Sequence, residues 1–223
     1  MKPRSFASAA RDLAAIGRRF YARGWVLGTS GNFSEVVERD PLRLAITASS
    51  VHKGQLRVTD ILRVNEQGQI VSGKSAKPSA ETLLHVEIVK RRGAGAVLHT
   101  HSVWSTILSG GPPERRALGI DGFEMLKGLD GVVTHEHQEW IPIVDNAQDM
   151  VPLARTVGET LDQWPAAHAF LLRRHGLYTW GATLADAERH VEILEFLFEA
   201  IGRERSGRAT LTEEAYHGAV KDP

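Results

Sequence analysis

The chain has 223 residues, of which 42% are hydrophobic and 24% charged, so it can form the core of one large domain or two small ones. Its 27 basic residues balance 27 acidic ones, which excludes a global attraction to nucleic acid or to an anionic membrane. The absence of cysteine excludes disulfides, thiolate nucleophiles and cysteine-ligated metals. Because no apolar run approaches the ~18 residues that span a bilayer, we expect one cytoplasmic domain over residues 1–223.

The N-terminal part of the chain combines one helix with short strands. Apolar residues recur at three- and four-residue steps from Phe6 to Phe20, which predicts a helix over residues 5–23 that Gly24 ends. A loop of small residues follows at 28–32. Short apolar runs bounded by turn residues then predict strands at 33–37, 43–48, 61–65 and 69–72.

The rest of the chain alternates helices with apolar strands. Its predicted elements are a helix over 79–92, a strand over 96–101, a strand within 132–144, a helix over 148–163, a buried strand over 169–179 that breaks at Gly176, and a helix over 183–203. The polar segment 206–223 is expected to form a flexible tail or to close a neighbouring site. Because several strands are joined by hairpin turns, this order favours a mixed or antiparallel sheet with helices on both faces.

Two histidines separated by one residue, His99 and His101, end one of the predicted strands. Side chains two residues apart on a strand point to the same side, so the two imidazoles can share one cation. Neutral imidazole suits zinc and other divalent metals. His175 is a third candidate, because it lies where the later strand breaks at a glycine. Three histidines from two strand ends would form an open site with a fourth position for water or substrate.

Histidine spacing alone leaves other interpretations open. His135 and His137 have the same spacing, but they lie among acidic and polar side chains, which favours a solvated strand face. The remaining histidines are interpreted as ordinary surface or packing residues: His52, His85, His168, His190 and His217.

Five short segments occur in the order that the class II aldolase and adducin-head family uses. They are GTSGNFS at 28–34, ITASS at 46–50, KPSAET at 77–82, HTHS at 99–102 and RHG at 174–176. The chain therefore resembles this family. The resemblance implies an α/β fold, a three-layer α/β/α sandwich around a mixed, mostly antiparallel central sheet. It also implies a homo-oligomer, commonly a tetramer, with active sites near subunit interfaces.

The resemblance assigns roles residue by residue. It implies one zinc ion per subunit on His99, His101 and His175, with Glu81 as the glutamate that aldolases use as a metal-associated acid/base. Ala80 departs from the family, because aldolases tend to carry a second serine there. The substrate is expected to be a small sugar phosphate, and the positions that cradle its phosphate are Ser30, Gly31, Asn32, Ser49, Ser50 and Ser79.

Positive charge near the phosphate is a separate question. Lys53 and Lys77 lie beside the phosphate segments in the sequence. Either lysine adds charge to the phosphate site or is an ordinary exposed lysine, and the sequence favours neither interpretation.

Two further segments resemble the dehydratase branch of the family: GFEMLKG at 122–128 and HGLYTWG at 175–181. That branch removes water from 5-methylthioribulose 1-phosphate in methionine salvage and forms 2,3-diketo-5-methylthiopentyl 1-phosphate. The resemblance implies that Glu124 is the general acid/base, whereas without it Glu124 would be a solvated loop carboxylate.

Two alternatives remain at this stage. The same metal chemistry serves sugar-phosphate aldolases and pentulose-phosphate epimerases, which differ in where the proton is removed. A metal-free, adducin-like interaction domain is the alternative from another class.

Overall fold

One sheet runs through the centre of the molecule. In the computed structural model, which describes residues 4–72 and 77–219, nine strands pair in the order β4-β3-β2-β1-β5-β9-β8-β7-β6. Neighbouring strands are antiparallel except β7 and β8, which are parallel. The strands are β1 (Asn32–Arg39), β2 (Leu42–Thr47), β3 (Ile61–Asn65), β4 (Ile70–Ser72), β5 (Ala96–Thr100), β6 (Ala117–Ile120), β7 (Glu139–Val144), β8 (Ala169–Leu172) and β9 (Gly176–Gly181).

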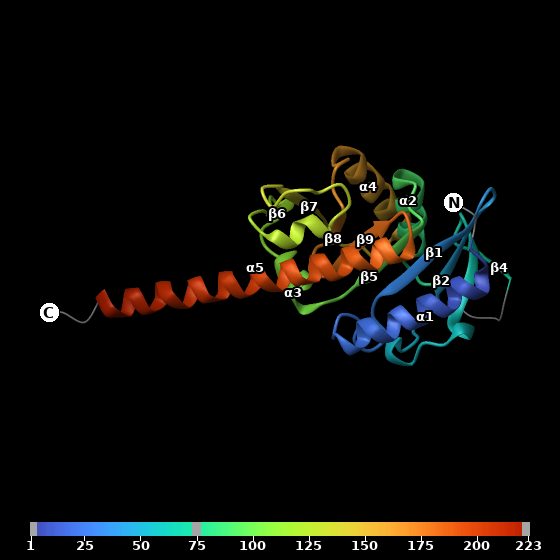
Figure 1. Ribbon diagram of the computed structural model, residues 1–223, viewed down its shortest axis with the longest axis horizontal. Helices are drawn as coiled ribbons and strands as arrows, with labels where there is room; N and C mark the ends of the chain where they lie inside the picture. The colour runs from blue at the N-terminus through green and yellow to red at the C-terminus, as the bar shows by residue number, and fades with distance from the viewer. Residues whose placement is uncertain (1–3, 73–76, 220–223) are drawn as a thin grey trace.

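Helices cover both faces of the sheet, which confirms the predicted three-layer α/β/α sandwich with a mixed, mostly antiparallel sheet (Figure 1). Apolar residues of α1 and α5 pack on one face, and those of α2 and α4 pack on the other. Helix α3 packs against α5 at the β6 end of the sheet. The α-helices are α1 (Phe6–Ala22), α2 (Thr82–Arg92), α3 (Val103–Leu108), α4 (Met150–Gln163) and α5 (Leu184–Ala219), and the 3₁₀ helices are η1 (Lys53–Gln55), η2 (Val58–Asp60) and η3 (Glu124–Gly128).

Strand β5 shows how the sheet divides its side chains between the two layers. Ala96 and Leu98 pack in the cluster with α1 and α5, while Val97 packs in the cluster with α2 and α4. Because successive side chains of a strand point to opposite faces, His99 follows Val97 to the α2 and α4 side. Thr100 points the other way, and its hydroxyl reaches Glu195 of α5 at 2.6 Å.

Three predicted boundaries are wrong. The helix predicted from Ser79 begins at Thr82, because the backbone carbonyl of Ser79 accepts from the backbone N–H of Thr82 and closes a turn first. The strand predicted over 169–179 is a hairpin of two strands, β8 and β9, joined by residues 173–175. The helix predicted to end at Arg203 continues to Ala219, through residues for which the sequence predicted a polar tail.

The segment between β5 and β7 contains elements that no pattern in the sequence predicted. They are α3, β6 and η3, each only four to six residues long, which is too short for a clear periodic pattern. His135 and His137 lie in the turn region before β7, so the predicted strand face for this pair is wrong.

Helix α5 crosses the sheet and then extends beyond the other elements toward the C-terminus (Figure 1). The residues that end the predicted tail, 220–223, lie outside the described part of the chain. Within residues 4–72 and 77–219, none of the helices combines the length and the apolar character needed to cross a bilayer.

Candidate metal centre and substrate cavity

Several strand ends meet at one edge of the sheet and bring distant segments of the chain together. The register pairs Asn32 at the start of β1 with His99 near the end of β5, and pairs His99 with Tyr178 of β9. Residues directly opposite one another on paired strands point to the same face. Asn32, His99 and Tyr178 therefore form a row across three strands. The Tyr178 ring stacks on the His99 ring, with centroids 3.8 Å apart and planes 13° from parallel.

His175 reaches the same edge from the turn between β8 and β9. The backbone N–H of His175 donates to Leu172 at 3.0 Å, which closes the turn. The next residue must be glycine, because a Cβ at Gly176 would lie 2.0 Å from the backbone oxygen of Thr100. This close approach of β9 to β5 brings His175 beside the two histidines of the other strand.

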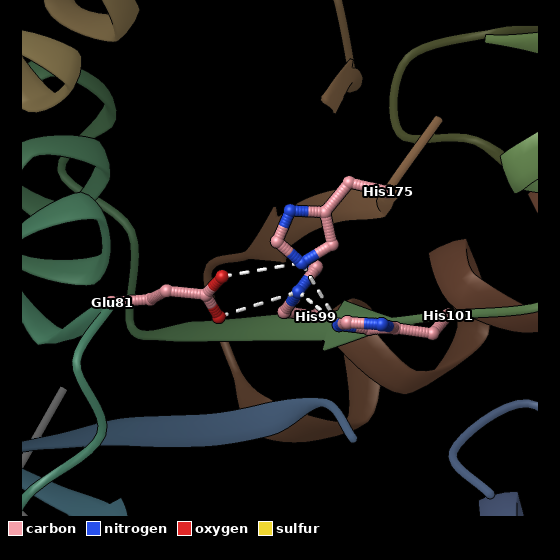
Figure 2. Close-up of side chains that lie close together, drawn as sticks. All are labelled: Glu81, His99, His101 and His175. Atoms are coloured by element: carbon pink, nitrogen blue, oxygen red, sulfur yellow. Dashed lines mark hydrogen bonds and ion pairs between the residues drawn. The ribbon is translucent and has the colours of Figure 1, made fainter. Parts of the chain in front are cut away.

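Four side chains converge at this edge: Glu81, His99, His101 and His175 (Figure 2). The Nε2 atoms of His99 and His101 are 2.7 Å apart, and those of His101 and His175 are 3.2 Å apart. The Glu81 carboxylate lies 3.4 Å from His99 Nε2 and 3.2 Å from His175 Nε2. All the potential ligand atoms lie within 4.8 Å of one another, so the four side chains form a group that could hold a metal ion.

The hydrogen bonds of the histidines fix which nitrogen faces the centre of this group. His99 donates from Nδ1 to the backbone oxygen of Leu177 at 2.8 Å, and His175 Nδ1 donates to the side-chain oxygen of Asn146 at 3.3 Å. In the neutral ring, an Nδ1–H leaves Nε2 with its lone pair. Such a bond to a carbonyl-type oxygen is the arrangement that orients histidine ligands in metal sites.

Burial keeps these rings neutral. Loss of solvent around His101 lowers its pKa to about 3, and burial also lowers the pKa of His175. Burial, followed by the neighbouring histidines, lowers the pKa of His99 well below its usual value. Neutral imidazole is the form that binds a metal, so the three rings are in the ligating state at physiological pH.

The spacing of the nitrogens also fits a small divalent ion. Two nitrogens each about 2.0–2.1 Å from one tetrahedral zinc ion are about 3.3 Å apart. The 3.2 Å separation of the His101 and His175 nitrogens matches this spacing, and the 2.7 Å separation of His99 and His101 is about half an ångström shorter. Three neutral imidazoles with one carboxylate form a donor set that zinc accepts.

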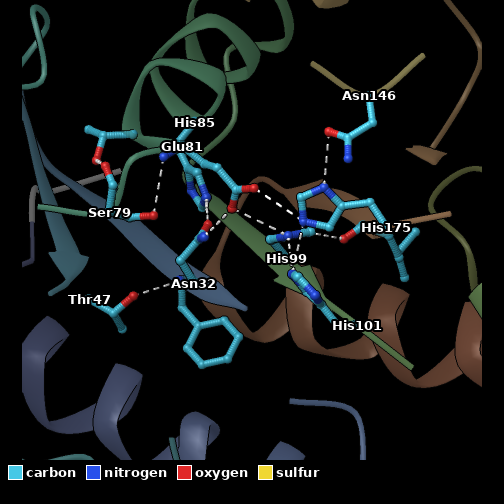
Figure 3. A network of polar contacts seen from close by, with 12 residues as sticks. Asn32, Thr47, Ser79, Glu81, His85, His99, His101, Asn146 and His175 are labelled. Carbon is cyan, nitrogen blue, oxygen red and sulfur yellow. Dashed lines mark hydrogen bonds and ion pairs between the residues drawn. The ribbon is translucent and has the colours of Figure 1, made fainter. Parts of the chain in front are cut away.

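A chain of hydrogen bonds behind the centre holds Glu81 (Figure 3). The amide nitrogen of Asn32 donates to Glu81 Oε2 at 2.6 Å. The Asn32 side-chain oxygen accepts from His85 Nε2, and His85 Nδ1 accepts from the Ser34 hydroxyl at 2.7 Å. Complete burial lowers the pKa of His85 to about 3 and keeps it neutral, as this pattern requires. Both polar atoms of the Asn32 side chain are therefore engaged by protein groups.

A cavity of about 240 Å³ opens beside the centre. Glu81, His101 and His175 line it. Gly31 has a φ of +73° and packs against the backbone oxygen of His99, so that a Cβ there would lie 2.7 Å from this atom. All six residues that the sequence assigned to the phosphate also line the cavity: Ser30, Gly31, Asn32, Ser49, Ser50 and Ser79.

Glu124 does not belong to this group. It lies in η3 with 68% of its side chain exposed, and its partners are Lys127 and, at 3.9 Å, His135. The ion pair with Lys127 lowers the pKa of Glu124, with a smaller contribution from His135. Glu124 is neither among the four converging residues nor among those that line the cavity beside them. The structure thus brings together every other residue that the sequence assigned to the site.

His85 and Asn146 lie beside the centre, although the sequence did not predict them as part of the site. His85 was interpreted as an ordinary surface or packing residue, although its position four residues after Glu81 places it one helical turn further along α2. Asn146, which supports His175 and lines the cavity, follows β7 in a segment without a recognisable motif. Spacing on a helix could have revealed His85, whereas Asn146 required the three-dimensional structure.

Residues 11–201 match the family model described as the Class II Aldolase and Adducin N-terminal domain. Methylthioribulose-1-phosphate dehydratase from Marinobacter nauticus is 45% identical over 195 residues, covering 87% of this chain and 92% of the relative. The enzyme of the same name from Pseudomonas aeruginosa is 47% identical over 191 residues, covering 85% and 91%. Among solved structures, L-fuculose 1-phosphate aldolase superposes with a TM-score of 0.73 at 20% identity, covering 89% of this chain and 87% of the aldolase.

Proposed function

The chain belongs to the class II aldolase and adducin family, and we infer that within it the chain is a hydro-lyase, the dehydratase of 5-methylthioribulose 1-phosphate in methionine salvage. The observation that carries this conclusion is identity of 45% and 47%, over 85% or more of the chain, to enzymes named methylthioribulose-1-phosphate dehydratase. The C3 proton and the C4 hydroxyl of the ketose leave as water, and the resulting enol becomes the 2,3-diketone. Action in the cytoplasm stays a prediction from the sequence.

We propose that His99, His101 and His175 hold one zinc ion in each subunit. The converging Nε2 atoms and the Nδ1 hydrogen bonds of His99 and His175 support this assignment. When bound, the ion supplies Lewis-acid stabilisation of negative charge on the substrate oxygens.

The six cavity-lining phosphate residues are proposed to bind the substrate phosphate through hydroxyls and backbone N–H groups. The hydroxyls of Ser49 and Ser50 lie 3.4 Å apart, and Ser50 has a φ of +60°. A phosphate needs donors rather than acids, and this part of the cavity supplies them. The side chain of Asn32 also binds Glu81 and His85, which fixes its position in the cavity wall.

Two carboxylates are proposed to handle protons. Glu81 is fixed by Asn32 beside the histidines, where it can exchange a proton with a substrate at the centre. We propose that Glu124 is the second acid/base and that it enters the cavity of a neighbouring copy, since it does not line the cavity of its own chain. A carboxylate must come within hydrogen-bond reach of the proton that it transfers.

Exposed apolar side chains support a homo-oligomer, which the family resemblance implies is a tetramer. Val103 and Ile107, one turn apart on α3, are 64% and 57% exposed. Helix α3 borders the centre, because the Thr106 hydroxyl donates to the backbone oxygen of His175 at 3.1 Å. Val133, which follows η3 in the chain, is 86% exposed. Apolar surface both beside the centre and beside the Glu124 segment fits an interface that unites the two.

Aldolase chemistry is the second candidate, and the position of Glu81 favours it. Glu81 is the carboxylate that lies beside the histidines, and in aldolases this glutamate is the acid/base. The two functions differ in which glutamate the reaction needs.

The decisive experiment compares Glu124→Gln and Glu81→Gln in the zinc-loaded protein, with formation of the diketone from 5-methylthioribulose 1-phosphate as the assay. Glu124→Gln is expected to lower kcat by about 10²–10⁴-fold with zinc retained, whereas Glu81→Gln should lower both rate and metal affinity. Glu136→Gln, which changes an exposed glutamate in the following turn, is the control. Dehydration near the wild-type rate by Glu124→Gln would reject the proposed role of Glu124.

Mixing two inactive variants tests whether Glu124 acts across an interface. Subunits with Glu124→Gln and subunits with His175→Ala are unfolded together, refolded and assayed. If Glu124 serves a neighbour, about a quarter of the sites in random mixed oligomers combine an intact histidine set with an intact Glu124, and activity returns. If both residues serve the same chain, every site stays defective.

A further inference from the structure

Lys53 is a buried lysine at the wall of the substrate cavity. Lys53 is only 1% exposed, although lysine is almost never fully buried unless its charge is paired. Its ammonium group donates two hydrogen bonds of 3.0 Å, one to the backbone oxygen of Thr29 and one to that of Val51. Burial lowers the pKa of Lys53 to about 8, with Glu81 acting in the opposite direction. The fold thus tolerates a costly group at this position.

The two acceptors belong to the two loops that flank the cavity. Thr29 precedes Ser30 and Gly31, while Val51 follows Ser49 and Ser50. The backbone N–H of Lys53 also donates to Gly28, at 3.3 Å. A single residue therefore fixes the distance between the two proposed phosphate loops.

The charge of Lys53 has a counterpart in the substrate. An ammonium group carries three N–H donors, and two of them bind the loop carbonyls. Among the described residues that line the cavity, Lys53 is the one lysine or arginine. Lys77 does not line the cavity; its side chain is exposed, and its backbone oxygen accepts from Ser49 at 2.9 Å. Of the two lysines near the phosphate segments, only Lys53 can place its charge beside the serines.

We propose that Lys53 recognises the charge of the substrate phosphate, because its buried ammonium group joins the two phosphate loops at the cavity wall and has a third N–H donor for an anion bound there. This inference rests on the proposed function for the identity of the anion. The charge of Lys53 would allow the site to distinguish a phosphate ester from a neutral sugar of the same shape, because hydroxyls and backbone N–H groups alone bind either one.

The test uses binding of inorganic phosphate to the zinc-loaded protein, measured by calorimetry, together with KM and kcat for 5-methylthioribulose 1-phosphate. Lys53→Met removes both the charge and the hydrogen bonds to the two loops. Lys53→Gln keeps a hydrogen-bond donor without the charge, whereas Lys53→Arg keeps the charge. Lys77→Met is the matched control. We expect Lys53→Met and Lys53→Gln to weaken phosphate binding by about 10–100-fold, equivalent to roughly 1.4–2.8 kcal/mol. KM should rise by a similar factor, with kcat and zinc content nearly unchanged.

Lys53→Arg should recover part of the phosphate affinity that Lys53→Gln loses, and Lys77→Met should bind phosphate as the wild type does. Phosphate binding by Lys53→Gln equal to that of Lys53→Arg would overturn the inference, and this comparison remains available if Lys53→Met does not fold. Phosphate binding that depends on Lys53 in a protein that fails to dehydrate the substrate would uphold the inference and reject the proposed function. The reverse result would reject the inference alone.

Discussion

Glu195 offers a test of how the core supports the metal centre. It lies in α5, behind β5, and its Oε1 accepts from the Thr100 hydroxyl at 2.6 Å. Thr100 stands between His99 and His101, so this hydrogen bond anchors the segment that carries two of the proposed ligands. Complete burial raises the pKa of Glu195 from its usual 4.5 to about 7, against the opposing effect of the Ser102 and Thr100 hydroxyls. The perturbation that we propose is Glu195→Gln, which resembles the protonated acid in size and hydrogen bonding.

The sign of the effect follows from proton binding. Between pH 4.5 and about 7 the folded protein holds a proton on Glu195 that the unfolded chain has released. Stability therefore falls as pH rises through this window and levels off above the folded pKa. At about 1.4 kcal/mol per pKa unit, the loss is on the order of 3 kcal/mol. Glutamine does not titrate, so the unfolding free energy of Glu195→Gln does not fall in this window. The variant should therefore be as stable as the wild type near pH 4.5 and more stable than it by about 3 kcal/mol near pH 8.

The assay is urea denaturation from pH 4.5 to 8.5 at a fixed protein concentration, with a chelator present so that metal binding does not contribute. The quantity compared is the difference in unfolding free energy between the variant and the wild type at each pH. Glu199→Gln, which changes a half-exposed glutamate on the same helix paired with Arg203, is the matched control. A constant difference between Glu195→Gln and the wild type across this range would refute the reasoning.

The remaining predictions concern the centre itself. His99→Ala should remove most bound zinc, measured by metal analysis of the purified protein, because it leaves two of three histidine ligands. Asn146→Ala should weaken zinc binding by about 10–100-fold in a chelator competition, because the Nδ1 hydrogen bond of His175 loses its acceptor. Gly31→Ala should raise KM and lower the unfolding free energy by about 1–3 kcal/mol in urea, since φ is +73° and the added Cβ meets His99 and Val26 at 2.7 Å.

Local patterns in the sequence predicted the elements that local interactions determine. The helix over 5–23 was recognisable because its apolar side chains share one face, and α1 occupies Phe6–Ala22. The hairpin of β3 and β4 followed from two apolar runs around a turn with Gly68. The short elements α3, β6 and η3 depend on packing against α5 and β7, and such tertiary contacts leave no periodic pattern in a few residues.

The split of the strand predicted over 169–179 shows the same limit. Residues 169–172 and 177–178 are apolar or aromatic, and β8 and β9 are buried along their whole length, so no alternation of apolar and polar residues marks the reversal. The turn at 173–175 contains no glycine or asparagine, and Arg174 takes the left-handed conformation with a φ of 51°. Glycine or asparagine usually marks such a position, so the sequence offered only Gly176, one residue after the turn.

Sequence motifs predicted some residues of the candidate site, and only the three-dimensional structure shows the position of others. Motifs identified the residues at the strand ends, and the sheet then brought them within a few ångströms because antiparallel neighbours place the end of one strand beside the start of the next. The roles of Lys53 and Lys77 stayed open in the sequence, because burial of a side chain depends on segments far away in the chain. Burial of Lys53 and its hydrogen bonds to the carbonyls of Thr29 and Val51 distinguish it from Lys77, which is exposed.

The two glutamates show where the specificity of such a site would arise. The histidine group with Glu81 is built from strand ends, which the sheet fixes, and it suits any reaction that stabilises negative charge beside a carbonyl. Aldol cleavage, epimerisation and dehydration differ in where a proton is removed and where one is supplied. In the proposed dehydratase, that difference comes from a group outside the shared centre. The proposed role of Glu124, which lies on an exposed 3₁₀ helix, fits such a group, and we expect a change in its segment to alter the reaction while the metal centre and the fold remain intact.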